Sequence, residues 1–228
     1  MVNFSHVTPQ EYLNSKIPEL IYRNGASFYQ VNGERFPRIS EVLNLLNSEG
    51  LQAWRKRVGD KVADMKCQIG IKRGKDVHAI IQAYLDNSCT CQFSDLLLAN
   101  AMVDSAKPTL NRISKIRGTE LPLFSHRLNV CGTADCIADF DGIASVIDFK
   151  TSEKPKRYEW CKRYFIQETF YSIAWEDMTN QPIEQLVTII ISENGEIQVL
   201  KEKRDDWILQ LEELVREFDY RKTVGVRK

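Results

Sequence analysis

A β-hairpin signal in the middle of the chain constrains the fold more than any other feature. The runs 132–140 and 144–149 are short and apolar with β-branched residues, and Asp141-Gly142 stands between them. An Asp-Gly pair between two such runs favours the tight turn of a two-residue hairpin. Because a third run of the same kind, 121–129, comes before them, the sequence predicts a meander of three antiparallel strands.

The hydrophobic pattern is helical on both sides of this meander. Before it, we predict helices over 39–46, 51–65, 70–85 and 93–113, the last of them kinked or ended by Pro108. After it, we predict a helix over 161–177, strands over 186–192 and 197–201, and a closing helix over 205–222. This order predicts an α/β protein of the α+β kind, in which helices flank a central mixed sheet. We expect one domain over 1–228, with a mainly helical lobe over 1–113 and a sheet-and-helix core over 114–228.

The charge of the chain is zero in sum but segregated along the sequence. The 31 Lys and Arg residues balance the 31 Asp and Glu residues. The segment 54–75 has eight basic and two acidic residues, and 150–166 has six basic and two acidic residues. The segment 202–219 compensates with seven acidic and three basic residues. The two basic segments predict either a surface that meets phosphate or well-solvated helix faces.

Cysteine usage and the N-terminal segment indicate the compartment. The six cysteines are few and scattered for a chain of 228 residues, which predicts reduced thiols. Residues 1–20 lack a basic region followed by an apolar run, so neither a secretion signal nor a transit peptide fits. No apolar stretch approaches the roughly 20 residues of a membrane span. We expect a cytoplasmic protein, in a bacterial or host cytosol, that has no membrane partner.

Two aspartates and a lysine fall on the predicted hairpin. Asp135 ends the stretch Gly132-Thr-Ala-Asp135, and Asp148 and Lys150 share one face of the next strand because residues two apart point the same way. The strands can bring Asp135 and Asp148 side by side, and two carboxylates among apolar residues favour a bound divalent cation, Mg²⁺ or Mn²⁺. Lys150 could then orient the attacking water in phosphodiester hydrolysis. The alternative is a plain Asp-Lys ion pair at a sheet edge.

Four short motifs occur in one order along the chain. They are Gly74-Lys-Asp-Val-His78, Gly132-Thr-Ala-Asp135, Asp148-Phe-Lys150 and Gln167-Glu-Thr-Phe-Tyr171. This arrangement resembles the RecB-like exonuclease branch of the PD-(D/E)xK nuclease superfamily. The resemblance implies a restriction-endonuclease-like core, with the helical lobe at its N-terminal side.

The run 147–156 and the stretch 36–40 resemble more narrowly the mitochondrial genome maintenance exonuclease family, over about Phe36 to Trp175. That resemblance implies a metal-dependent exonuclease that acts on single-stranded DNA in replication, repair or recombination. Because the chain lacks a presequence, we expect a bacterial or bacteriophage relative.

The resemblance also implies roles for individual residues. It makes Asp135, Asp148 and the carbonyl of Phe149 metal ligands and Lys150 the catalytic lysine. His78 would be a further metal ligand or a contact to the scissile phosphate. Glu120 would lie beside the site, and Gln167 and Tyr171, one helical turn apart, would position the nucleotide or the lysine. The alternatives are a histidine satisfied on a helix face, an exposed glutamate and a core tyrosine.

Further residues are candidates for contacts with DNA. Basic and hydroxyl side chains follow the catalytic strand, and the aromatic residues Trp160, Tyr158 and Tyr164 stand among them, as in a groove that stacks single strands. The candidates are Ser40, Trp54, Arg73, Lys75, Thr151, Ser152, Lys154, Lys156 and Arg157. Trp54 could instead anchor its helix in the core. No Fe–S cluster is expected, since no cysteine follows Cys161.

The sequence thus predicts a Mg²⁺- or Mn²⁺-dependent deoxyribonuclease that works from the ends of single-stranded DNA. One alternative keeps the fold and changes the substrate, to give a structure-selective or double-strand endonuclease. Another is a non-catalytic nucleic-acid-binding subunit with a vestigial site. A P-loop nucleotide-binding protein is excluded, because no GxxxxGK[ST] run occurs.

Overall fold

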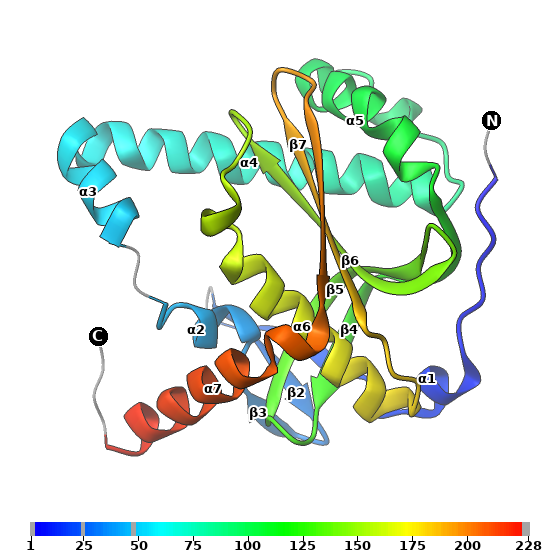
Figure 1. The fold of residues 1–228 in the computed structure, drawn as a ribbon, viewed down its shortest axis with the longest axis vertical. Helices are drawn as coiled ribbons and strands as arrows, with labels where there is room; N and C mark the ends of the chain where they lie inside the picture. The colour runs from blue at the N-terminus through cyan, green and yellow to red at the C-terminus, as the bar shows by residue number, and fades with distance from the viewer. Residues whose placement is uncertain (1–2, 24–25, 47–48, 225–228) are drawn as a thin grey trace.

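The computed structural model describes residues 3–23, 26–46 and 49–224. Its centre is a five-stranded sheet in the order β4-β5-β6-β7-β8 (Figure 1). The strands are β4 (Ile113–Ser125), β5 (Val130–Phe140), β6 (Ile143–Ser152), β7 (Gln185–Ser192) and β8 (Ile197–Lys203). Neighbouring strands are antiparallel except β6 and β7, which are parallel. The predicted α+β class, with a central mixed sheet flanked by helices, is confirmed.

The predicted hairpin forms between β5 and β6. Asp141 and Gly142 have φ angles of +54° and +80°, the left-handed pair that a type I′ turn requires. The parallel pair β6-β7 needs a crossover, and α6 (Lys162–Thr179) supplies it. This helix carries the Gln167 and Tyr171 motif back across the sheet.

Helices cover both faces of the central sheet. On one face, α4 (Asp60–Leu85) and α5 (Leu97–Leu110) pack on alternate residues of the strands, which include Ile147, Phe149 and Ile189. On the other face, α6 packs with α2 (Ile39–Leu43) and α7 (Ile208–Thr223) against residues that include Val146 and Leu186. The two buried layers place α4 and α6 on opposite sides of β6, the strand that bears Asp148 and Lys150.

The N-terminal part holds a three-stranded sheet that the hydrophobic pattern did not predict. It consists of β1 (Glu19–Arg23), β2 (Ala26–Val31) and β3 (Glu34–Phe36), and follows the short α1 (Gln10–Asn14). Asn32 and Gly33, with φ angles of +52° and +86°, form its second turn, so an Asn-Gly hairpin signal was present in the sequence. Tyr29 and Val31 pack this sheet on Phe124 and Cys131 of the central sheet.

Segment 1–113 is therefore not simply a helical lobe, because α4 and α5 belong to the core of the central sheet and β1–β3 attach to it. Two helix boundaries also differ from prediction. The break expected after residue 65 lies at Gly59, whose φ of +83° ends α3 (Glu49–Val58) and starts α4. Pro108 lies inside α5, which runs on to Leu110 before β4 begins.

The cysteines depart from prediction in part. Cys67, Cys131, Cys136 and Cys161 are free, and the last three are buried. Cys89 is disulfide-bonded, which corrects the expectation that all six cysteines are reduced thiols. Among the described helices, none combines the length and apolar character that a membrane crossing requires.

Close packing around Gly132 explains why the Gly-x-x-Asp motif begins with glycine. A Cβ at this position would lie 2.8 Å from Cε1 of Tyr171, 2.9 Å from Cγ2 of Ile39 and 3.0 Å from Cε1 of Phe170. We expect Gly132→Ala to lower the free energy of unfolding by about 1–3 kcal/mol, because the packed side chains must shift.

Urea unfolding measures this change. The control is Gly50→Ala on α3, where an added Cβ meets nothing within 4 Å and stability should stay equal or rise by up to about 1 kcal/mol. Equal effects of the two substitutions would contradict the packing explanation.

Candidate functional site

The site is built where β5 and β6 separate. Cys136 pairs with Ile147, and the hydrogen-bonded ladder between the two strands ends there. In its place, Oδ2 of Asp135 accepts a hydrogen bond of 2.8 Å from the backbone N–H of Phe149. The side chain of Asp135 therefore completes the pairing that the strand backbone leaves open.

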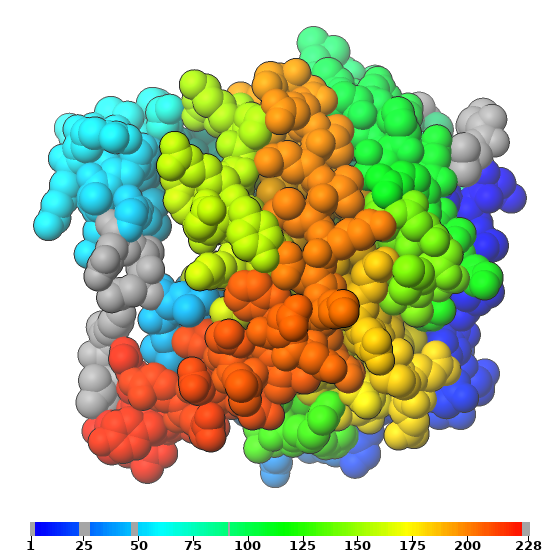
Figure 2. Space-filling view, viewed as in Figure 1, coloured from blue at the N-terminus to red at the C-terminus, as the bar shows by residue number. Residues whose placement is uncertain are grey.

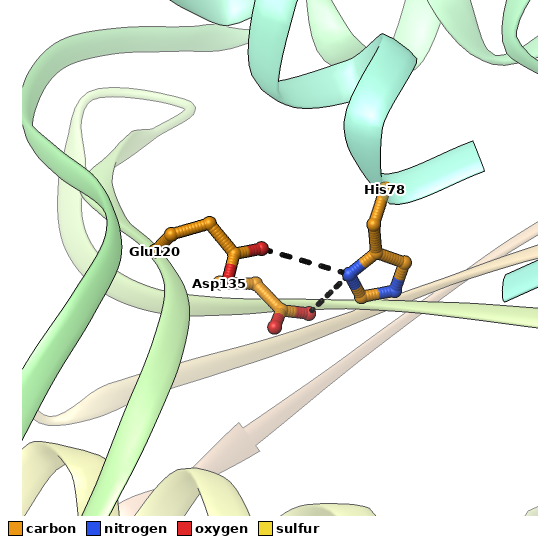
Figure 3. Close-up of side chains that lie close together, drawn as sticks. All are labelled: His78, Glu120 and Asp135. Carbon is orange, nitrogen blue, oxygen red and sulfur yellow. Dashed lines mark ion pairs between the residues drawn. The ribbon is translucent and has the colours of Figure 1, made fainter. Parts of the chain in front are cut away.

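His78 approaches the same point from α4. Its Nε2 lies 2.8 Å from the carbonyl oxygen of Phe149, so side chains satisfy both backbone groups of that residue. Its Nδ1 lies 3.8 Å from Oδ2 of Asp135 and 3.9 Å from Oε1 of Glu120 (Figure 3).

Glu120 enters the site from β4. Thr119 pairs with Cys136 and Leu121 with Ala134, so Glu120 lies opposite Asp135. Its φ of +47° breaks the regular strand geometry there.

His78, Glu120 and Asp135 form a cluster that could hold a metal ion, and one ligand atom from each lies within 4.8 Å of the others. Burial lowers the pKa of His78, but the charge of Asp135 and the hydrogen bond to Glu120 outweigh it and raise the value to about 9. The imidazolium thus balances the two carboxylates. Imidazole and carboxylate groups also suit a divalent transition metal such as Mn²⁺.

Asp148 and Lys150 lie on the face of β6 opposite to Ile147 and Phe149, which pack toward α4. Asp148 is in register with Thr188, whose hydroxyl donates to Glu168 of α6. The carboxylate of Asp148 is fully buried and forms an ion pair with the ammonium of Lys150. Burial raises the pKa of Asp148 to about 6 despite the opposing charge of Lys150. Burial would lower the pKa of Lys150, but Asp148 and Asp135 together raise it.

The predicted metal ligands therefore fall into two groups. Asp135, His78 and the backbone of Phe149 lie together with Glu120, while Asp148 lies with Lys150 and outside the cluster. The charge of Asp135 still raises the pKa values of Asp148 and Lys150, so the two groups interact electrostatically. The buried carboxylate of Asp148 pairs with the ammonium of Lys150, and the charge of His78 also favours its ionised form.

The Gln167 and Tyr171 motif faces the same region from α6. Nε2 of Gln167 donates to the hydroxyl of Tyr171 at 2.8 Å. Burial, together with the charges of Asp135 and Asp148, raises the pKa of Tyr171 well above its ordinary value. The phenol therefore stays neutral beside the carboxylates.

Glu168 is a residue that the sequence reasoning missed. It is fully buried, one oxygen accepts from Thr188, and the other has no hydrogen-bond partner among the described residues. Burial and the charge of Asp148 raise its pKa well above the ordinary value. A glutamate in a helix usually predicts an exposed position, so only its place beside Gln167 could have drawn attention to it.

Some of the predicted DNA contacts line one groove, and others lie outside it. One groove is lined by Trp54, Arg73, Thr151, Ser152, Lys154 and Lys156. Arg157 lies near its rim, with its guanidinium carbon 5.5 Å from the centre of the Trp160 ring. Ser40 on α2 and Lys75 on α4 are exposed and do not line the groove.

Comparison with known proteins gives two related sequences. Over 99 residues the chain is 35% identical to human "Mitochondrial genome maintenance exonuclease 1", a match that covers 43% of this chain and 27% of that protein. Over 111 residues it is 27% identical to the mouse protein of the same name, with 46% of this chain and 32% of that protein covered. The chain is a relative of these exonucleases. It matches about a third or less of their length.

Two further comparisons add little. No protein-family model matches the chain. A solved structure from Eubacterium rectale, provisionally assigned as an exonuclease, is 11% identical with a TM-score of 0.49, and the match covers 70% of this chain and 69% of that one.

The buried Glu168 generates a prediction about stability and pH. Its folded-state pKa is raised above the ordinary value of 4.5, so between the two values the unfolded chain binds fewer protons than the folded one. The free energy of unfolding of the wild type should therefore fall relative to that of Glu168→Gln as the pH rises above 4.5. Urea unfolding over a pH series, without metal, measures this difference. Parallel curves for the two proteins would contradict a neutral, buried Glu168.

Proposed function

We propose that this protein is a metal-dependent DNA exonuclease that hydrolyses phosphodiester bonds and prefers single-stranded DNA. One observation carries the proposal. The buried Asp148–Lys150 pair lies next to the cluster of His78, Glu120 and Asp135. Two carboxylates, a lysine and metal-ligating groups at the end of a sheet are what hydrolysis of a phosphodiester requires, and the related sequences are named as exonucleases.

The donor set fits Mg²⁺ or Mn²⁺. The proposed ligands are Asp135, His78, Asp148 and the carbonyl of Phe149, with Glu120 beside them. Carboxylate and carbonyl oxygens are the ligands that both ions accept, and a fully buried carboxylate such as that of Asp148 is stabilised by a nearby cation. A bound divalent cation would polarise the scissile phosphate and activate a water for attack.

The protein's own groups divide the remaining work. The ammonium of Lys150, held by Asp148, would offset negative charge on the phosphate and orient the attacking water. His78, whose Nε2–H donates to the carbonyl of Phe149, would fix the backbone of β6 at the reaction point. Gln167 and the neutral Tyr171 would position a nucleotide or the lysine.

Two other functions use the same site. A double-strand or structure-selective endonuclease needs the same metal ligands, and a non-catalytic DNA-binding subunit needs only the basic surface. The buried pair of Asp148 and Lys150 favours the enzyme, because a buried ion pair without a chemical role rarely improves stability over apolar residues.

Metal binding should stabilise the fold. We expect saturating Mn²⁺ or Mg²⁺ to raise the unfolding temperature of the wild type, because a ligand at 100 times its Kd adds about 2.7 kcal/mol. Asp135→Asn should reduce this shift. Asp76→Asn on α4, where the carboxylate pairs with Lys72 outside the cluster, should keep it. Thermal unfolding followed by circular dichroism measures the shift, and an equal shift in all three proteins would contradict the metal site.

Cleavage tests the function itself. We expect the wild type to degrade labelled linear single-stranded DNA with Mg²⁺ or Mn²⁺ and not with a chelator. Lys150→Met should lower the rate by about 100-fold or more, because the charge that stabilises the transition state is lost. Lys222→Met at the exposed end of α7 is the control, and circular dichroism checks that both variants fold.

The choice of substrate separates the alternatives. Cleavage of closed single-stranded circles would contradict the exonuclease. DNA binding without any cleavage in either metal, unchanged in Asp148→Ala, would favour the non-catalytic subunit. Strands labelled at the 5′ or the 3′ end report the direction of degradation.

A further inference from the structure

We propose that the groove between α3, α4 and the segment after β6 binds an unpaired DNA strand, and that Trp160 selects for single strands by stacking on a base. This inference rests on the proposed nuclease function, which it deepens by naming how the substrate is held. The groove has a volume of about 510 Å³. Its walls come from parts of the chain that are far apart in sequence.

The walls of the groove have different origins. Trp54 of α3 and Lys66 and Arg73 of α4 line one side, and residues Thr151 to Lys156 with Trp160 line the other. Figure 2 shows this side of the molecule hollowed between the cyan α3 and the yellow-green segment that follows β6.

Trp160 has the surroundings of a binding residue rather than of a core residue. Its side chain is 64% exposed, whereas Trp175 is fully buried. It belongs to a short 3-10 helix (Tyr158–Trp160), and the guanidinium of Arg157 lies 5.5 Å from its ring centre. An exposed indole beside a cation suits a nucleotide, because the base stacks on the ring while the cation meets phosphate.

The groove adjoins the end of the strand that bears the proposed catalytic lysine. Thr151 and Ser152 follow Lys150 on β6, so the groove begins where the catalytic strand ends. The ring of Tyr164 on α6 lies 5.2 Å from Nζ of Lys150 and 5.7 Å from Nζ of Lys156. One aromatic ring therefore connects the proposed catalytic lysine with a lysine of the groove wall.

The charge of the groove matches a phosphate backbone. Lys66, Arg73, Lys154 and Lys156 line it, against one acidic residue, Glu153. Arg73 pairs with Glu193 and Lys66 with Glu153. Over the described part of the chain, no carboxylate lies within ion-pair distance of Lys154 or Lys156, which leaves these two ammonium groups for phosphate.

Stacking explains a preference for single strands. An unpaired strand can present the face of a base to Trp160, while the bases of an intact duplex are covered by their neighbours in the stack. The lysines attract both forms of DNA through phosphate. Trp160 should therefore contribute to binding of single strands and not to binding of duplex.

Fluorescence anisotropy tests the proposal in a buffer with chelator, where no cleavage occurs. The probes are fluorescein-labelled oligothymidylate and a labelled duplex of equal length. The proteins are the wild type, Trp160→Ala, Trp160→Phe and Lys154→Ala. The control is Tyr22→Ala on β1, an exposed aromatic residue outside the groove.

We expect Trp160→Ala to weaken binding of the single strand by about 5- to 100-fold, as for the loss of one stacked base, and Trp160→Phe to restore part of it. Duplex binding should stay unchanged. Lys154→Ala should weaken both and reduce the salt slope for the single strand by about 0.7, whereas Trp160→Ala should leave that slope unchanged. Tyr22→Ala should behave as the wild type.

Wild-type affinity for oligothymidylate in Trp160→Ala would overturn the proposal, as would an equal loss for single strand and duplex. The nuclease assay gives a separate answer. Protein that binds through Trp160 and cleaves nothing would contradict the proposed enzyme and still support the groove. Protein that cleaves with Trp160→Ala unimpaired in binding would contradict the groove alone.

Discussion

The site depends on one local constraint, the point where β5 and β6 stop pairing at Cys136 and Ile147. Beyond it, the N–H and C=O of Phe149 need partners, because a buried backbone group without a hydrogen bond is costly. The carboxylate of Asp135 accepts a hydrogen bond from the N–H, and the imidazole of His78 donates one to the C=O. Hydrogen bonding to the backbone of β6 therefore holds Asp135 and His78 in place. The same hydrogen bonds bring together side chains that suit a metal ion.

Charged groups from several elements then gather around β6. His78 of α4, Glu120 of β4 and Asp135 of β5 form one cluster, and Asp148 and Lys150 form an ion pair on β6 itself. Glu168 of α6 is buried nearby against Thr188, which is in register with Asp148. Burial alone would neutralise these carboxylates, and it raises the pKa of both Asp148 and Glu168. Lys150 opposes that change for Asp148. Buried carboxylates whose pKa values are raised in this way are frequent at functional sites.

Prediction from sequence worked where local pattern and covalent geometry decide the outcome. The Asp141-Gly142 hairpin, the alternation on β6 and the crossover helix α6 follow from turn chemistry and from periods of two and 3.6 residues. It failed at β1–β3, where the strands are short and stabilised by packing on Phe124 and Cys131. It failed also at the break at Gly59, because the helical pattern continues through that position and only the φ of +83° reveals the end of α3.

The sequence by itself determined which residues could do chemistry and the order in which they occur, because strand alternation and helical spacing assign Asp148, Lys150, Gln167 and Tyr171 to particular faces. Only the tertiary structure decided which of these groups meet. It brought His78, Glu120 and Asp135 into one cluster, buried Glu168 against Thr188, and lined one groove with α3, α4 and the segment after β6. The reason is that such contacts join segments far apart in the chain, and their geometry depends on how layers pack rather than on any local pattern.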